Sequence, residues 1–209
     1  MKIIRRYKRR LRAGIEAKPV LLAVGILAII VIMNFNHDKQ LSVAPASYKP
    51  LLDLIADVES KGNYNAYFGN ADNSSIQFTK MSIAEVQQWQ KEQVASGSPS
   101  SAVGRYQIID VTLSELVNNL HLDQNQLFDE STQDKMAIAL LERRGSVALV
   151  NNKMSRTDFA ANLAKEWASL PKITGSNPDD SYYAGDGLNR SLVHRDKVLS
   201  AVDLLKPIY

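Results

Sequence analysis

The sequence of 209 residues contains no cysteine. This absence excludes disulfide bonds, thiolate zinc sites and cysteine nucleophiles. Only three histidines occur, and no two of them have the spacing of metal ligands on one helix. A Gly-rich phosphate-binding loop is also missing. We therefore expect a functional site that uses neither a metal ion nor a cofactor.

A net positive charge is found only in the N-terminal region. Residues 1–40 contain nine Lys and Arg against two acidic residues, a balance of +7. The rest of the chain has 16 basic and 20 acidic residues, a balance of −4. A nucleic-acid-binding domain would carry its basic patch on the folded face. A nucleic acid is therefore not an expected partner.

The N-terminal region has the pattern of a membrane anchor. A basic segment, residues 1–18, precedes an uncharged apolar run at 19–35. As a helix this run would extend roughly 25 Å, slightly short of the ~30 Å hydrocarbon core. Snorkelling of Lys18 would close the gap. The charge bias predicts a cytoplasmic N-terminus. We expect a single-pass membrane protein that contacts lipid through 19–35 and has a periplasmic domain.

The alternative for this region is a cleaved signal peptide. Ala44-Pro45-Ala46 has the small-x-small form of a cleavage site. However, it lies well beyond the apolar run and contains a proline. Residues 36–49 are instead predicted to be a short polar linker, which leaves residues 50–209 as the folded domain.

The folded domain is predicted to be mainly α. The spacing of apolar residues predicts helices over about 50–61, 82–94, 112–120, 131–144, 155–167 and 189–205. Capping boxes open two of them, at Ser82–Glu85 and Thr112–Glu115. Residues 64–80 are expected to form a small hairpin or irregular lobe, and residues 171–187 a long loop.

Two short features in this domain suggest chemistry. Glu59 stands at the predicted C-terminal end of the first helix, where the helix dipole and apolar neighbours raise a carboxyl pKa. By residue type alone, however, a glutamate in a last helical turn is usually a solvated surface residue. The segment Gly104–Gln107 combines close backbone approach with an aromatic and an amide side chain. It also fits a turn before a buried pair.

Four segments occur in a characteristic order: Leu54–Ser60, Ala102–Gln107, Glu142–Gly145 and Trp167–Pro171. Together they resemble the lysozyme-like lytic transglycosylases of the bacteriophage lambda endolysin type. The resemblance spans roughly residues 50–205. Glu59-Ser60 also resembles the Glu-Ser pair of cellular soluble lytic transglycosylases. The resemblance implies an α+β lysozyme-like fold and peptidoglycan glycan strands as the substrate.

The resemblance also implies roles for particular residues. Glu59 corresponds to the single catalytic acid, and Trp167 to a packing residue. The expected substrate-binding residues are Ser60, Gly104, Arg105, Tyr106 and Gln107. In such enzymes the muramic acid 6-hydroxyl closes a 1,6-anhydro ring, so no second carboxylate is needed.

Residues 63–80 depart from the family pattern, which leaves alternatives open. Asp72 lies 13 positions after Glu59 and would be the second carboxylate of a hydrolytic muramidase, although Asn73-Ser74 beside it favour a turn. Tyr182 and Tyr183 on the 171–187 loop are expected to close over the glycan, although an exposed tyrosine pair on a loop is also common without a function. A non-catalytic wall-binding assembly protein is the alternative of another class.

A tethered enzyme of this kind suggests local wall opening for phage genome delivery or lysis. The expected partners are therefore components of a virion or an envelope complex. The internal membrane of a virion is the alternative location. This setting is inferred from the phage-like resemblance alone.

Overall fold

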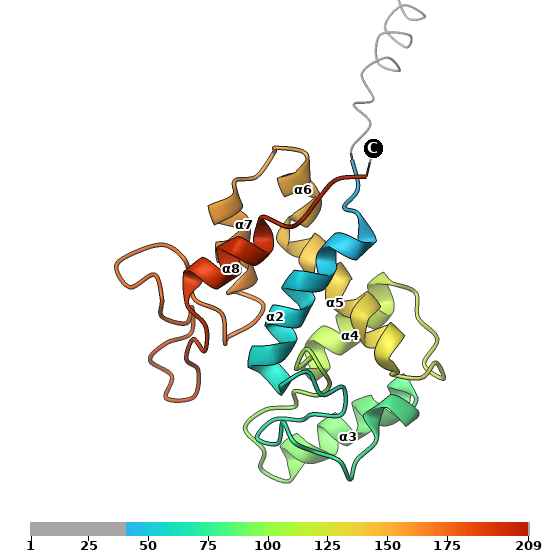
Figure 1. Cartoon of the computed structure of the whole chain (residues 1–209). Helices are drawn as coiled ribbons and strands as arrows, with labels where there is room; N and C mark the ends of the chain where they lie inside the picture. Colours follow the sequence, from blue (N-terminus) through green and yellow to red (C-terminus); the bar gives the residue numbers. More distant parts are fainter. Residues whose placement is uncertain (1–40, 209) are drawn as a thin grey trace, which may run out of the picture. The chain divides into compact units, whose positions relative to one another are not determined.

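The computed structural model describes residues 41–208 as a mainly helical domain (Figure 1). Its elements are η1 (Pro45–Tyr48), α2 (Lys49–Ser60), η2 (Phe78–Lys80), α3 (Ile83–Ala95), α4 (Asp110–Asn119), α5 (Glu130–Arg144), α6 (Ser146–Val150), α7 (Arg156–Leu163) and α8 (Arg195–Val202). Over this range, residues pair only in isolated β-bridges. The mainly α prediction is confirmed, and residues 64–80 form the irregular lobe rather than a regular hairpin.

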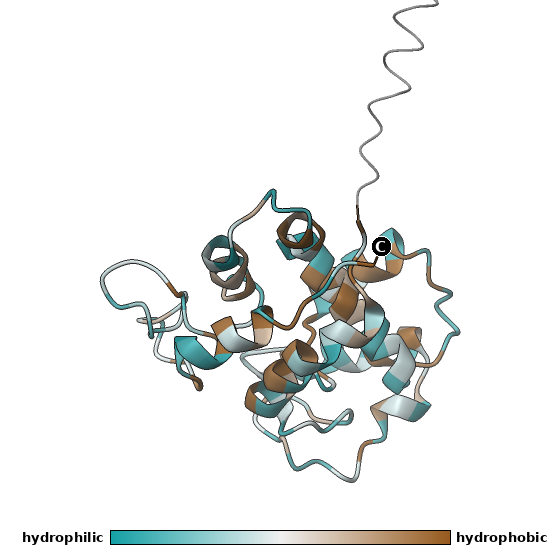
Figure 2. Cartoon of the chain, turned by 45° about the horizontal axis from the view of Figure 1, so that its top comes forward, coloured by the Kyte–Doolittle hydropathy of each residue, from teal (hydrophilic) through white to brown (hydrophobic). Residues whose placement is uncertain are grey.

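The helix α2 lies at the centre of the domain and packs against both α5 and α8. Its buried face carries Leu51, Leu52, Ile55 and Ala56. In Figure 2 the helices carry hydrophobic residues, in brown, interspersed with hydrophilic residues, in teal. Burial of each large apolar side chain stabilises the fold by about 1.5–3 kcal/mol. The end of α2 is therefore held rigidly by the core.

The end of α2 places Glu59 in the last helical turn. Lys61 adopts a left-handed conformation, and its N–H donates to Asp57 O at 3.2 Å. The N–H of Gly62 donates to Ala56 O at 3.0 Å, with φ +79°. These bonds satisfy the last carbonyls of the helix. The predicted stop at Lys61-Gly62 is confirmed.

One predicted capping box is confirmed and the other is wrong. Ser82 Oγ accepts from the N–H of Glu85, whose side chain accepts from the N–H of Ser82. The next helix does not begin at Thr112, because α4 already starts at Asp110. There the N–H of Asp110 donates to Ser101 Oγ at 3.0 Å. The hydroxyl of Ser101, which lies outside the helix, thus accepts from its first N–H in place of a capping side chain within the helix.

Three further boundaries differ from prediction. α5 begins at Glu130 with Asp129 as its cap, one turn or less before the expected start. α7 ends at Leu163, so Trp167 lies outside the helix. α8 begins at Arg195, because the segment that precedes it lines a cleft instead of continuing the helix.

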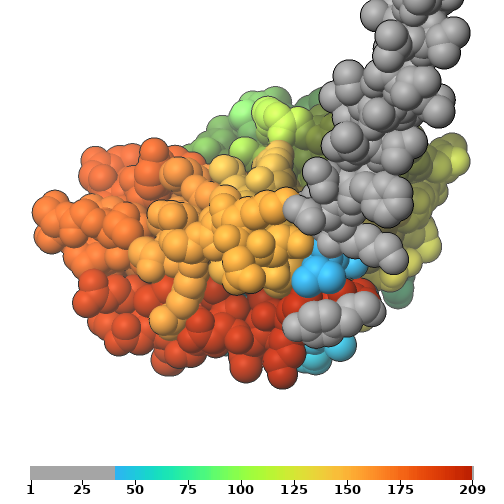
Figure 3. All heavy atoms as spheres, turned by 90° about the horizontal axis from the view of Figure 1, so that it is seen from above, coloured from blue at the N-terminus to red at the C-terminus, as the bar shows by residue number. Residues whose placement is uncertain are grey.

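The two ends of the described chain lie together. Val43 pairs with Pro207 in an antiparallel bridge, and Ile208 N–H donates to Ser42 O at 2.8 Å. Val43 and Tyr48 are buried. The part of the expected linker at 41–49 therefore packs into the domain. Seen from above in Figure 3, the C-terminal segments in orange and red cover one side of the domain.

The expected membrane location needs correction. Across residues 41–208, the helices are all too short or too polar to cross a membrane. This finding is against the single-pass membrane protein that the sequence predicted. The basic segment 1–18 and the apolar run 19–35 lie outside the described residues.

Candidate active site

Glu59 lies in a cleft of about 740 Å³. The cleft is open on one side and brings together residues that are far apart in the sequence. Its walls come from the end of α2, from Phe68 and Gly69, from positions between 99 and 109, from residues 166–169 and from positions between 188 and 192.

The carboxyl group of Glu59 is half-buried and has one close side-chain partner. The hydroxyl of Ser169 donates to Glu59 Oε1 at 2.5 Å. Burial raises the pKa of Glu59, because a charged carboxylate is poorly solvated there. The hydrogen bonds from Ser169 act in the opposite direction and lower this pKa. The balance leaves a carboxyl that keeps its proton to higher pH than an exposed glutamate, as a general acid requires.

Ser60 points away from the cleft. It is buried, and its Oγ lies 3.1 Å from Ala56 O and 2.7 Å from Arg105 O. The second contact joins the end of α2 to the turn at residues 104–107. Its geometry therefore supports a positioning role for Ser60 rather than the substrate contact that was expected.

Of the three side chains in the turn 104–107, only that of Gln107 lines the cleft. Gly104 has φ +78°, and a Cβ atom there would lie 2.3 Å from Gln133 Oε1. Gln107 lines the cleft, and its Nε2 donates to Gly104 O at 2.9 Å. Gly104 is thus required by close packing, while Gln107 is placed to meet a ligand.

Arg105 and Tyr106 occupy a partly buried polar cluster away from Glu59. The guanidinium of Arg105 donates to Asp53 Oδ1 at 2.8 Å and lies 4.8 Å from the centre of the Tyr64 ring. The Tyr106 hydroxyl donates to Asp134 Oδ1 at 2.6 Å. Burial, and secondly the bond to Asp134, raise the pKa of Tyr106 above its usual value. Neither side chain lines the cleft, so the expected sugar contacts are not placed here.

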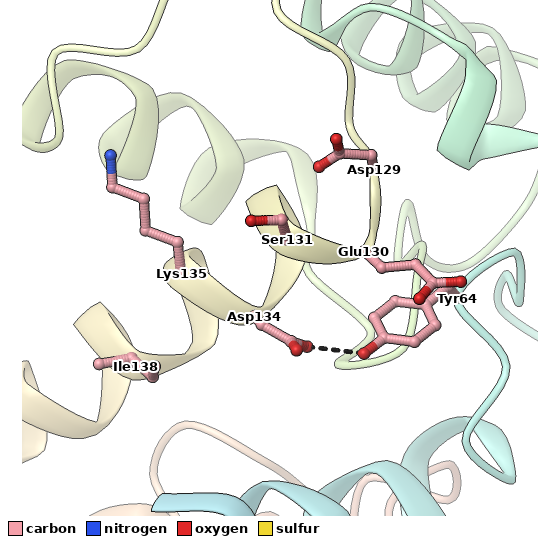
Figure 4. A pocket seen from close by; sticks show the side chains of 7 residues that line it. All are labelled: Tyr64, Asp129, Glu130, Ser131, Asp134, Lys135 and Ile138. Carbon is pink, nitrogen blue, oxygen red and sulfur yellow. Dashed lines mark hydrogen bonds between the residues drawn. The ribbon is translucent and has the colours of Figure 1, made fainter. Parts of the chain in front are cut away.

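Figure 4 shows the surface hollow next to this cluster, at the N-terminal part of α5. The Tyr64 hydroxyl donates to Asp134 Oδ1 there at 2.9 Å. Lys135 and Ile138 also line the hollow. It shares no lining residue with the Glu59 cleft. The two hollows are therefore separate features of the domain.

Residues of the segments Glu142–Gly145 and Trp167–Pro171 hold the chain in place beside Ser169. The side chain of Glu166 is only 6% exposed and is held by Arg143 at 2.8 Å and by Arg144 at 2.7 Å. Trp167 is buried, and its Nε1–H donates to Tyr106 O at 3.1 Å. These contacts fix the chain just before Ser169. A packing role for Trp167 agrees with its expected role.

Two sets of expected residues lie elsewhere. Asp72 has a largely exposed side chain paired with Lys61 at 2.7 Å, and it does not line the cleft. Tyr182 and Tyr183 are exposed and pack edge to face, with ring centres 5.1 Å apart. The Tyr183 hydroxyl donates to Lys165 O at 2.9 Å. Neither tyrosine lines the cleft in this structure.

Several residues of the cleft could not be chosen from the sequence. Its rim carries four exposed large apolar side chains, which are Phe68, Ile109, Leu188 and Leu192. Apolar groups exposed around a concave polar site are typical of a ligand-binding cleft. Ser169 was also missed, because a serine inside a packing motif has no distinguishing signal. Over residues 41–208, no group of three or more acidic or histidine side chains could hold a metal ion.

Comparison with known protein families matches residues 49–184 to the family described as Endolysin. The match runs from the start of α2 into the loop after Trp167, and it includes Glu59, Gln107 and Ser169. No curated protein and no solved structure matches the chain. Since the family covers more than half of the sequence, the chain belongs to the Endolysin family, the phage enzymes that degrade peptidoglycan.

Proposed function

We propose that this endolysin is a lytic transglycosylase that cleaves the bond between N-acetylmuramic acid and N-acetylglucosamine. The supporting observation is the composition of the cleft, where Glu59 is the one carboxyl without an ionic partner. Glu166 is the other carboxyl of the lining, and two arginines neutralise it. A hydrolase of the usual kind needs a second working carboxylate, about 5–5.5 Å away when retaining and about 6.5–9.5 Å when inverting.

The proposed reaction uses Glu59 twice. Its carboxyl first protonates the glycosidic oxygen while the bond from that oxygen to C1 of muramic acid breaks. The N-acetyl group of the same sugar stabilises the positive charge that develops at C1. The 6-hydroxyl then bonds to C1 and gives its proton to the Glu59 carboxylate. No water is consumed, and Glu59 regains the proton it donated.

The raised pKa of Glu59 suits its role as the acid that protonates the glycosidic oxygen. Ser169 suits the later step, in which Glu59 is an anion and takes the proton of the 6-hydroxyl. Burial keeps the carboxyl protonated so that it can act as an acid. After proton transfer the group is an anion in a poorly solvated place. The Ser169 hydroxyl then stabilises that anion with a charge-assisted hydrogen bond. The pair thus supports both forms of the same side chain.

The remaining cleft residues fit an N-acetylated glycan. Phe68, Leu188 and Leu192 offer apolar surface to sugar ring faces and to acetyl methyl groups. The Nε2 of Gln107 is bound to Gly104 O, so its carbonyl oxygen is the group that would accept from a substrate hydroxyl or N–H. We propose that the enzyme opens the bacterial wall for a phage, during lysis or genome delivery.

Product analysis tests this proposal. Purified peptidoglycan would be digested with the enzyme, and the soluble fragments weighed by mass spectrometry. A lytic transglycosylase gives 1,6-anhydromuramic ends, lighter by one water than reducing ends. Reducing-end fragments would instead support a muramidase, the alternative in which Asp72 assists. Binding to the wall without any fragments would support a non-catalytic wall-binding protein.

A further inference from the structure

One wall of the Glu59 cleft is formed by residues 186–192, a segment beyond the family match. Leu188, Asn189, Arg190 and Leu192 all line the cleft. Asp186 closes a turn at the start of the segment, where its Oδ1 accepts from the N–H groups of Leu188 at 2.9 Å and of Asn189 at 2.8 Å. The side chains that follow are thus presented by a defined turn.

The other end of this segment is attached beside the catalytic carboxyl. The N–H of Leu192 donates to Ser169 O at 2.8 Å, and the hydroxyl of Ser169 contacts Glu59. Arg190 lies two positions before this attachment. Its backbone is therefore fixed close to the site of cleavage, while its exposed side chain is free to reach along the cleft.

Arg190 brings a positive charge to the cleft that no ion pair within residues 41–208 neutralises. The lining contains three charged residues, which are Glu59, Glu166 and Arg190. Glu166 is paired with Arg143 and Arg144. Across residues 41–208, Arg190 itself takes part in no ion pair. A ligand with an anionic group would supply the missing partner.

The chemistry of peptidoglycan indicates which group that is. The glycan strand is uncharged where each muramic lactyl group is joined to a peptide through an amide. The carboxylates of such a strand belong to the stem peptides. A guanidinium binds a carboxylate through two parallel hydrogen bonds, which makes arginine the residue suited to this contact.

We propose that Arg190 binds a stem-peptide carboxylate, so that the preferred substrate is peptide-bearing glycan whose stem carboxylates are free rather than amidated. This inference rests on the proposed glycan cleavage at Glu59. It adds a specificity-determining residue outside the family-like segments.

The contact can be tested by combining one change in the enzyme with one change in the substrate, as in a double-mutant cycle. Peptide-bearing glycan strands would be compared with the same strands after carbodiimide coupling of their carboxyl groups to ammonia. This treatment turns each carboxylate into a neutral amide of similar shape. Values of kcat/KM would be measured for the wild type and Arg190→Gln on both substrates. The coupling between the two changes isolates the contact from other effects of either one.

We expect amidation to lower kcat/KM about tenfold for the wild type, as for loss of a charge-assisted hydrogen bond. For Arg190→Gln the ratio between the two substrates should fall to about one. Lys172→Gln is the matched control, since Lys172 lies in the same connection between α7 and α8 but does not line the cleft. It should show the wild-type ratio. Equal effects of amidation on the wild type and Arg190→Gln would overturn the proposal.

Glu59→Gln separates this inference from the proposed function. That variant should be inactive on both substrates. If it remains active, the proposed mechanism fails, whatever Arg190 does. If Glu59→Gln is inactive and the Arg190 coupling is absent, only the peptide contact fails.

Discussion

Ser169 and Glu59 are 110 positions apart in the sequence, yet the hydroxyl of one donates to Oε1 of the other at 2.5 Å. The bond joins the turn after α7 to the last turn of α2. It favours the charged form of a carboxyl whose burial favours the neutral form. The acidity of Glu59 is therefore set by two opposing contributions, each of which can be changed separately.

Ser169→Ala should shift the pH dependence of catalysis. Without the hydroxyl, burial of Glu59 acts with less opposition, and its pKa rises further. Because the acid must be protonated, the alkaline limb of the kcat/KM profile should move to higher pH. We also expect the maximal rate to fall about tenfold, since the carboxyl is less well positioned.

Ser169→Thr keeps a hydroxyl at this position and should return the alkaline limb toward that of the wild type. Thermal unfolding of both variants would show that they are folded. An unchanged alkaline limb in folded Ser169→Ala would mean that Ser169 does not influence the ionisation of Glu59.

Glu59→Gln should stabilise the protein at neutral pH. The pKa of Glu59 is raised in the native state by burial, so the native state holds its proton more tightly than the unfolded state. The associated stability is present below the unfolded glutamate pKa of about 4.3 and is lost as pH rises through the raised value. The neutral amide avoids this loss. We expect Tm to rise by a few degrees at pH 7 and to match that of the wild type near pH 4, as measured by circular dichroism.

Glu85 provides a control of opposite sign. Hydrogen bonds from Ser82, the backbone N–H first, lower its pKa. Its contribution to stability is therefore present above the unfolded glutamate pKa and is lost as pH falls through the lowered value. Glu85→Gln should lower Tm at pH 7 and have less effect in acid. A lower Tm for Glu59→Gln at pH 7 would show that the ionised carboxylate of Glu59 does not destabilise the native state.

Gly104→Ala should destabilise the domain more than Gly69→Ala. Both glycines have nearly the same left-handed backbone, with φ +78° and +79°. A Cβ at Gly69 meets no atom within 4 Å, whereas one at Gly104 would lie 2.3 Å from Gln133 Oε1. That amide accepts from Arg105 N–H at 2.9 Å and is buried, so it cannot move cheaply.

Backbone strain alone should cost about 1 kcal/mol in Gly69→Ala, and the collision should add about 1–3 kcal/mol in Gly104→Ala. Urea unfolding of both variants would give the two free energies. Equal losses would show that the turn at 104–107 is not as tightly packed as the structure indicates.

Local signals in the sequence predicted local structure well. The capping box at Ser82 and the helix stop at Gly62 depend on neighbours within a few residues, and both are confirmed. The predicted start of α4 was wrong, because the first N–H of the helix, that of Asp110, bonds to Ser101, which lies nine positions earlier and outside the helix. The mainly helical class was predicted from the spacing of apolar residues. In α2 the residues with this spacing form the buried face of the helix.

The candidate site was predictable only in part. Glu59 and Gln107 came from the ordered resemblance, and the structure places both in one cleft. Arg105 and Tyr106 have the chemistry of sugar-binding residues, but in the structure they bond to Asp53 and Asp134 in a partly buried cluster outside the cleft. Ser169 reaches Glu59 only through tertiary structure, which residue type and spacing do not reveal.

Asp72→Asn is the matched control for the central claim, that Glu59 alone supplies the catalytic carboxyl. It makes the same change of carboxylate to amide at a side chain that is exposed and paired with Lys61. Its lytic rate should stay within about twofold of the wild type, because a surface pair contributes little. A large loss of activity would instead favour a muramidase that needs both carboxyl groups.

The most direct measurement is the rate at which Glu59→Gln releases fragments from purified peptidoglycan, compared with the wild type and Asp72→Asn under the same conditions. General acid catalysis contributes at least about 10²-fold. We predict a loss of that size or greater in Glu59→Gln, with the variant folded by circular dichroism. A folded Glu59→Gln protein that cleaves at the wild-type rate would contradict the account.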